Sequence, residues 1–324
     1  MKRVEIDVSV KGGIGEYMVI YLEWMLINNY SAESVRCRKP DLSSINNWLM
    51  ERGVNMPTEI TKSVIEQYQK FLFYRRKEDG NPLSNQRQTV LIVSIRAFCK
   101  WMSKNGYLLY NPAADIDLPK REHRIIRGVL TSHEVESIIS QANTQSPVGL
   151  RDRAIMEVIY STGIRRSEAA ALKYDDIDYE RGSLFVSQGK GKRDRLIPIG
   201  SRALKWLEKY INEVRAMFEN DLSGKSLFIS LKGEPITANR LSLSFKEYRR
   251  SAKIKKSGAC HLFRHSMATA MLENGADIRY IQEMLGHKNI ETTQLYTHVT
   301  INTLKDVHTK THPSATLRRR NKLV

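Results

Sequence analysis

Apolar side chains recur at helical spacing through the first third of the chain. Four apolar stripes follow this period: Tyr17, Ile20, Tyr21 and Trp24; Leu42, Ile45 and Leu49; Val64, Tyr68, Phe71 and Leu72; and Leu91, Ile95, Phe98 and Met102. Such spacing is typical of helices that bury one face. The pattern therefore predicts a helical domain over residues 14–117. Residues 1–13 are polar and end in Gly12-Gly13, so we expect them to form a loose leader.

The apolar period breaks before the second half of the chain. Pro112 and Pro119 precede the basic stretch KREHRIIRG at 120–128. Prolines and charge without an apolar period are typical of a linker, which we assign to residues 118–128. Thr131 or Ser132 then provides an N-cap for the next helix.

A second domain is predicted over residues 129–301, and its pattern is mixed. Helical spacing recurs at about 151–162, 202–218, 238–252, 261–274 and 277–285. Between 183 and 200 (SLFVSQGKGKRDRLIPIG), two β-prone runs flank a Gly-Lys-Gly-Lys turn, which predicts a hairpin. The expected fold class is thus mainly α with a small antiparallel β-sheet.

Charge narrows the classes of partner. The 324 residues include 52 Lys+Arg against 35 Asp+Glu, a net charge of +17. Residues 1–127 hold 20 basic and 14 acidic side chains, and residues 128–324 hold 32 and 21, so both halves are positive. This excess favours nucleic acid over an anionic membrane as the partner.

Other features exclude several protein classes. No apolar run reaches the roughly 18–20 residues of a membrane span, and the N-terminus lacks the apolar core of a signal peptide. Cys37, Cys99 and Cys260 lie far apart without a CxxC motif, which excludes a disulfide framework and a structural zinc motif. We expect a cytoplasmic, nucleoid-associated protein that does not bind membranes.

Several cationic residues in the second half are candidates for binding an anion. Arg165 lies where one predicted helix ends and the next begins, a position suited to a phosphate; the alternative is a surface arginine paired to Glu168. Lys190 lies in the glycine-rich turn, where it is either a ligand-binding or a merely solvated lysine. His261 and Arg264 are spaced i, i+3, so they either share an anionic ligand or serve as a helix cap and an ion pair.

Two further candidate residues lie near the C-terminal end of the chain, and the sequence does not favour metal-dependent, serine-nucleophile or ATP-dependent chemistry. His287 lies after Gly286 at a predicted helix end, and Tyr296 lies within TTQLYTHV. His308 and His312 have a metal-ligand spacing, but the nearby carboxylates are scattered over different faces. The sequence contains neither a GxSxG elbow nor a Walker loop. We therefore expect no cofactor and no metal, only cations, hydrogen-bond donors and a tyrosine.

The order and spacing of these candidates resemble the tyrosine recombinase (phage integrase) family. The matching residues are Arg165, Lys190, His261, Arg264, His287 and Tyr296. They lie within the sequence segments YSTGIRRSE, GKGKRDRLIPIG, HLFRHSMAT and MLGHKNIETTQLYTHV. The Xer-like branch is the most similar, since Asn111-Pro112-Ala113 and the tail LKDVHTKTHPSA also fit it. The similarity runs from about residue 14 to 313.

The resemblance implies a fold and an activity. It implies an all-α, SAM-like core-binding domain and an α/β catalytic domain that form a C-shaped clamp on duplex DNA. The enzyme would be a site-specific recombinase that acts through a 3′-phosphotyrosyl intermediate and a Holliday junction. Two alternatives stay open: a monomeric type IB topoisomerase-like enzyme that relaxes DNA, and a catalytically silent DNA-binding regulator.

The resemblance also implies a role for each catalytic residue. Tyr296 would be the nucleophile, and Arg165 and Arg264 would bind the scissile phosphate. Lys190 would be the general acid, with Lys192 as the alternative. His261 would assist proton transfer and His287 would hydrogen-bond the phosphate. Glu168 would orient Arg165 rather than act on the substrate.

Regions outside the catalytic set receive roles as well. Arg87, Arg96, Lys100 and Lys104 lie opposite the apolar stripe of the fourth helix, and form either a DNA-binding face or a solvated one. Residues 302–324 would dock on a neighbouring protomer of a homotetramer; the alternative is a frayed basic terminus. A paralogous recombinase or an accessory protein is a further partner that the resemblance allows. Pro40 interrupts the second helix of the family pattern, so that helix is expected to start late or to kink.

Overall fold

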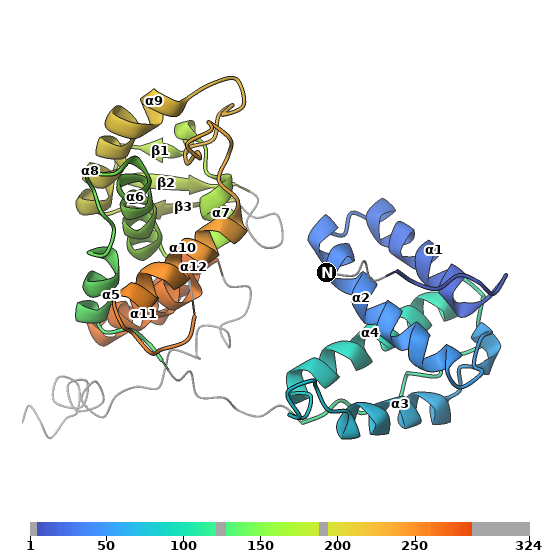
Figure 1. Ribbon diagram of the computed structural model, residues 1–324. Coiled ribbons are helices and arrows are strands. Elements are labelled where there is room, and N and C mark those ends of the chain that lie inside the picture. Colours follow the sequence, from blue (N-terminus) through green and yellow to red (C-terminus); the bar gives the residue numbers. More distant parts are fainter. Residues whose placement is uncertain (1–4, 121–127, 188–193, 259, 287–324) are drawn as a thin grey trace, which may run out of the picture. The chain divides into compact units, whose positions relative to one another are not determined.

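The computed structural model describes residues 5–120, 128–187, 194–258 and 260–286. The chain divides into two compact units, residues 1–123 and 124–324 (Figure 1). Among the described residues no helix is both long and apolar enough to cross a membrane.

The first unit is built from helices. They are α1 (Ile14–Ile27), α2 (Ala32–Met50), α3 (Lys62–Tyr74) and α4 (Asn85–Lys104), with a short 3-10 turn at Pro57–Glu59. Each of α2, α3 and α4 begins with an N-cap hydroxyl, which accepts a hydrogen bond from the backbone N–H of the third helical residue. The caps are Ser31, Thr61 and Ser84. The predicted stripes of α2 and α4 are buried, as are Tyr68 and Leu72 of α3. These predictions are confirmed.

The buried face of α1 differs from the prediction. The helix buries Ile14, Met18, Tyr21, Leu22 and Met25, whereas Ile20 is 37% exposed. Nearly every position of α1 is apolar, so more than one face fits the helical period. Packing against α2 and α4 decides which face is buried.

The leader is packed against α2 at residues 5–7, so the expectation of a loose segment was wrong there. Ile6 is buried. Ser43 Oγ donates to the carbonyl of Glu5 at 2.7 Å, and Asn46 Nδ2 donates to that of Asp7 at 3.0 Å. Polar side chains of α2 and burial of Ile6 therefore hold this part of the leader.

Pro40 lies inside α2, which begins at Ala32, so of the two expected outcomes, a late start or a kink, the late start was wrong. Proline removes the hydrogen bond to the carbonyl four residues earlier. That carbonyl belongs to Arg36, an exposed residue. Burial of Leu42, Ile45 and Leu49 after the proline stabilises the rest of the helix.

The second unit combines helices with a small sheet. Its helices are α5 (Ser132–Ile139), α6 (Pro147–Thr162), α7 (Arg166–Ala171), α8 (Ser201–Tyr210), α9 (Ala216–Phe218), α10 (Ala238–Ser251), α11 (Cys260–Glu273) and α12 (Ile278–Leu285), with a 3-10 turn at Tyr174–Asp176 and a π-helical turn at Ile211–Arg215. Strands β1 (Ile177–Asp178), β2 (Ser183–Val186) and β3 (Arg195–Pro198) form an antiparallel sheet in that order. Leu184 pairs with Ile177 and with Ile197. The predicted hairpin and fold class are confirmed.

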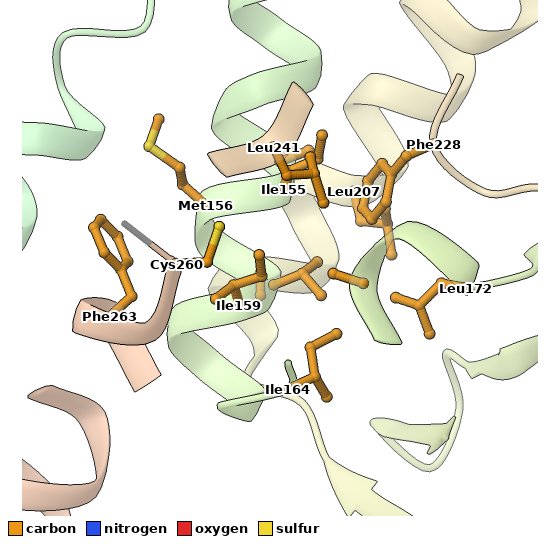
Figure 2. Packing of buried hydrophobic residues seen from close by; sticks show 14 of the residues in the cluster. Ile155, Met156, Ile159, Ile164, Leu172, Leu207, Phe228, Leu241, Cys260 and Phe263 are labelled. Carbon is orange, nitrogen blue, oxygen red and sulfur yellow. The ribbon is translucent and has the colours of Figure 1, made fainter. Parts of the chain in front are cut away.

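Helix α6 forms the centre of the second unit. In Figure 2, its residues Ile155, Met156 and Ile159 are surrounded by side chains from other elements, among them Leu207 and Phe263. A smaller cluster joins α11 to α12 through Met267, Ala268, Ile281 and Leu285, with Tyr160 of α6 packed against it. This packing brings the end of α12 to the end of α6.

Candidate functional site

The turn between α6 and α7 positions the first candidate, Arg165. Helix α6 ends at Gly163, whose φ of 63° favours glycine. Arg165 is the N-cap residue of α7, and its backbone N–H donates to Glu168 Oε2 at 2.9 Å. The predicted helix end and helix start are confirmed, and the local fold fixes the backbone of Arg165.

Glu168 lies between two arginines. Arg165 Nη1 is 2.7 Å from Glu168 Oε1, while Arg195 Nη2 is 2.7 Å from Oε2 and its Nη1 3.2 Å from Oε1. Burial raises the pKa of Glu168, but the hydrogen bonds from Arg195 and from the Arg165 backbone outweigh it and hold that pKa below its usual value. Glu168 is therefore ionised, in contact with Arg165 as the sequence predicted.

Three arginines meet at the last turn of α12. Arg264 of α11 is 4% exposed and donates to the carbonyls of Gly163 and Leu285, the latter at 2.7 Å. Arg165 Nη2 donates to the carbonyl of Gly286 at 3.2 Å, and Arg195 Nε to that of Met284 at 3.0 Å. The last carbonyls of a helix carry partial negative charge and have no intrahelical partner. We call Arg165, Arg195 and Arg264 the arginine cluster.

Sequence reasoning missed Arg195 as a member of this cluster. The residue stands at the start of β3, two positions before the buried Ile197. Alternate strand residues share a face, so an arginine in phase with Ile197 must point inward and find an anionic partner. That alternation was available in the sequence.

His261 lies beside the arginine cluster, on the first turn of α11. Partial burial and then the positive charges of Arg264, Arg166 and Arg165 lower the pKa of His261 below its usual value. The imidazole is consequently neutral at pH 7 and able to accept a proton. The structure thus brings together Arg165, His261 and Arg264. Lys190, Lys192, His287, Tyr296 and the tail at 302–324 lie outside the described residues.

The candidate DNA-binding residues of the first unit all lie on α4, but in different settings. Lys100 and Lys104 are exposed, and Arg96 is half-buried with its Nη2 3.5 Å from the carbonyl of Ala114. Arg87 is paired with the buried carboxylate of Asp41 at 2.5 Å, which offsets much of its charge. The two lysines therefore present the most accessible charge of the four residues.

Comparison with known proteins identifies the family. The model of the phage integrase family matches residues 128–303. Over 298 residues the chain is 43% identical to tyrosine recombinase XerC 2 of Ralstonia nicotianae, covering 92% of this chain and 86% of that protein. The chain belongs to the phage integrase family. It is also 34% identical to tyrosine recombinase XerD of Listeria monocytogenes, over 91% of this chain and 98% of that one. The predicted membership of the tyrosine recombinases, in their Xer-like branch, is confirmed.

Solved structures support the fold of this family member. The crystal structure of XerA recombinase is similar with a TM-score of 0.51 and 27% identity, over 92% of this chain and 99% of that one. XerH recombinase bound to a palindromic difH substrate, after cleavage, gives a TM-score of 0.69 at 20% identity, over 87% of this chain and 80% of that one. At that identity the XerH likeness establishes the fold alone.

Proposed function

We propose that this tyrosine recombinase is a site-specific enzyme that cleaves and rejoins duplex DNA through a 3′-phosphotyrosyl intermediate. The observation that carries the proposal is the meeting of Arg165 and Arg264 at the end of α12, with a neutral His261 close enough for its pKa to be lowered by their charges. Three arginines against one glutamate leave a positively charged site, which suits a phosphodiester. The XerC and XerD relatives are named as recombinases, which favours this function over a topoisomerase-like or silent one.

The chemistry follows from the groups of the site. The Tyr296 hydroxyl attacks phosphorus and loses its proton to His261, while the bond from phosphorus to the 5′-oxygen breaks. Lys190 donates a proton to that leaving oxygen. Extra negative charge on the non-bridging oxygens is stabilised by Arg264 and Arg165, and the contacts described above use two of the five N–H groups of Arg165. Because one phosphodiester replaces another, the reaction consumes no ATP.

DNA binding is proposed to involve both units. The exposed Lys100 and Lys104 of α4 would contact phosphates, with Arg96 beside them. Four protomers would assemble on two paired sites, each docking its residues 302–324 on a neighbour. The enzyme would act on DNA in the cytoplasm.

Covalent trapping on DNA tests the function. A half-site is first selected by binding from a random duplex library, and is then built with a nick beyond the scissile phosphate so that the released strand diffuses away. The wild-type chain should form an adduct that survives a denaturing gel. Arg165→Ala and Arg264→Ala should each slow adduct formation by about 10²-fold, as expected for loss of one donor to the transition state.

A supercoiled plasmid separates the alternative functions. Recombination that requires two copies of the selected site supports the proposal. Relaxation without a second site would favour the topoisomerase-like enzyme. Binding with neither cleavage nor relaxation would favour the silent regulator.

A further inference from the structure

Arg195 is committed to the protein's own groups. Its Nε, Nη1 and Nη2 each donate a hydrogen bond, to Met284 O, Glu168 Oε1 and Glu168 Oε2, and its side chain is 11% exposed. These contacts join β3 to α7 and to the end of α12. In the sequence, β3 follows the turn that contains Lys190, and α12 precedes His287.

The position of Glu168 creates an electrostatic problem for Arg165. A carboxylate in contact with Arg165 attracts the same guanidinium that the phosphate would need, and Glu168 is only 5% exposed. Burial weakens solvent screening, so this competition is stronger than it would be at the surface. Arg195 makes two hydrogen bonds to Glu168, against one from the Arg165 side chain.

We propose that Arg195 is a positioning residue that neutralises Glu168 and thereby keeps the positive charge of Arg165 available to the scissile phosphate. The inference rests on the proposed function. With Arg195 present, the arginine cluster and Glu168 together carry a net charge of two positive units. Without Arg195, Arg165 and Glu168 form a neutral pair, so the phosphate faces one unit of positive charge fewer. Arg195 exerts this effect without touching the DNA.

The same unit offers a matched control. Glu157 is also a buried glutamate shared by two arginines: Arg153 at 2.8 Å, with a side chain 13% exposed, and Arg202 at 2.8 Å. Arg153→Met therefore removes one of two arginines from a buried glutamate, as Arg195→Met does, but at a different location. It should leave DNA cleavage unchanged.

The test measures adduct formation on the nicked half-site in a single turnover, with half-site affinity measured by gel shift. Arg195→Met should slow cleavage by about 10²-fold, while half-site affinity changes by less than about threefold, since bulk phosphate contacts set affinity. Adding Glu168→Gln to Arg195→Met restores the net charge of the site, so the double variant should cleave roughly tenfold faster than Arg195→Met. Arg195→Lys, which keeps the charge, should be faster than Arg195→Met.

A neutral substrate separates an electrostatic role from a structural one. A methylphosphonate at the scissile position lacks one negative charge, so the ratio of wild-type to Arg195→Met rates should shrink to within about threefold. An equal ratio on both substrates, or no recovery in the double variant, would overturn the proposal. So would a normal rate for Arg195→Met. Absence of adduct with the wild-type chain would instead refute the proposed function, and this inference with it.

Discussion

The end of α6 is held by close packing around Gly163, which replacement by alanine should disturb. A Cβ at this position would overlap Met267 Cε and lie 3.0 Å from Leu285 Cδ2. Left-handed backbone costs a residue with a Cβ about 1–2 kcal/mol. Displacing the flexible end of Met267 costs about 1 kcal/mol more, the low end for overpacking. Gly163→Ala should thus lower the free energy of unfolding of the second unit by about 2–3 kcal/mol. Cleavage should slow as well, because the Gly163 carbonyl accepts a hydrogen bond from Arg264.

Native-state hydrogen exchange of the α6 amides, followed by mass spectrometry, measures this free energy because core amides exchange through global opening. Gly224 is the matched control, since its φ is 48° and an alanine methyl there would have no neighbouring atom within 4 Å. Gly224→Ala should carry the backbone cost alone. Combining Gly163→Ala with Met267→Ala should cost about 1 kcal/mol less than the sum of the single changes. Equal losses in Gly163→Ala and Gly224→Ala would refute the packing argument.

Four further outcomes are expected. Tyr296→Phe should abolish the covalent adduct while leaving DNA affinity unchanged; persistent adduct on a denaturing gel would assign the nucleophile to another residue. A 5′-bridging phosphorothiolate, whose sulfur leaves without a proton, should restore cleavage to Lys190→Ala, whereas rescue of Lys192→Ala instead would reassign the acid. Burial lowers the pKa of His265 from 6.5 to about 4, so between these pH values the unfolded chain binds more protons than the folded one. The free energy of unfolding of the second unit should therefore fall as the pH drops from 6.5 toward 4. Urea unfolding at a series of pH values should show a shallower fall for His265→Gln, and the same dependence on pH in both proteins would contradict this. Deleting residues 303–324 should leave single half-site binding near normal but abolish cooperative pairing and strand exchange in gel-shift and plasmid assays, and normal recombination would exclude a docking role for the tail.

Strong local patterns made much of the fold predictable. The hairpin was marked by two β-prone runs around a glycine-rich turn, and β2 and β3 pair as expected. The stripe of α4 was predictable because Leu91, Ile95, Phe98 and Met102 recur at helical spacing, and all four are buried. Thr131, one of the two predicted caps, caps α5, because a hydroxyl before a helix with Glu134 three residues later forms a capping box.

Contacts between residues far apart in the sequence were harder to predict. In α1 apolar residues surround the helix, so local periodicity could not choose between faces, and tertiary contacts placed Ile20 outside. Arg195 is in phase with the buried Ile197, which indicates an inward-facing side chain, but strand alternation does not identify its partner Glu168, which is 27 residues away. Arg165, His261 and Arg264 lie in the elements expected for them, yet their meeting at the end of α12 depends on how three helices pack.

The packed leader has a consequence for how the N-terminus can be altered. A Cβ on Gly15 would overlap the carbonyl oxygen of Asp7, so the leader backbone lies directly against the first turn of α1. A truncation that begins at residue 14 would remove the acceptors of Ser43 and Asn46, two buried polar side chains of α2. Water would have to replace these acceptors, and the net loss of an intramolecular hydrogen bond costs about 0.5–1.5 kcal/mol each. Affinity tags and fusion partners therefore belong before residue 5, and a shortened chain that starts at the first helix would begin with a damaged core.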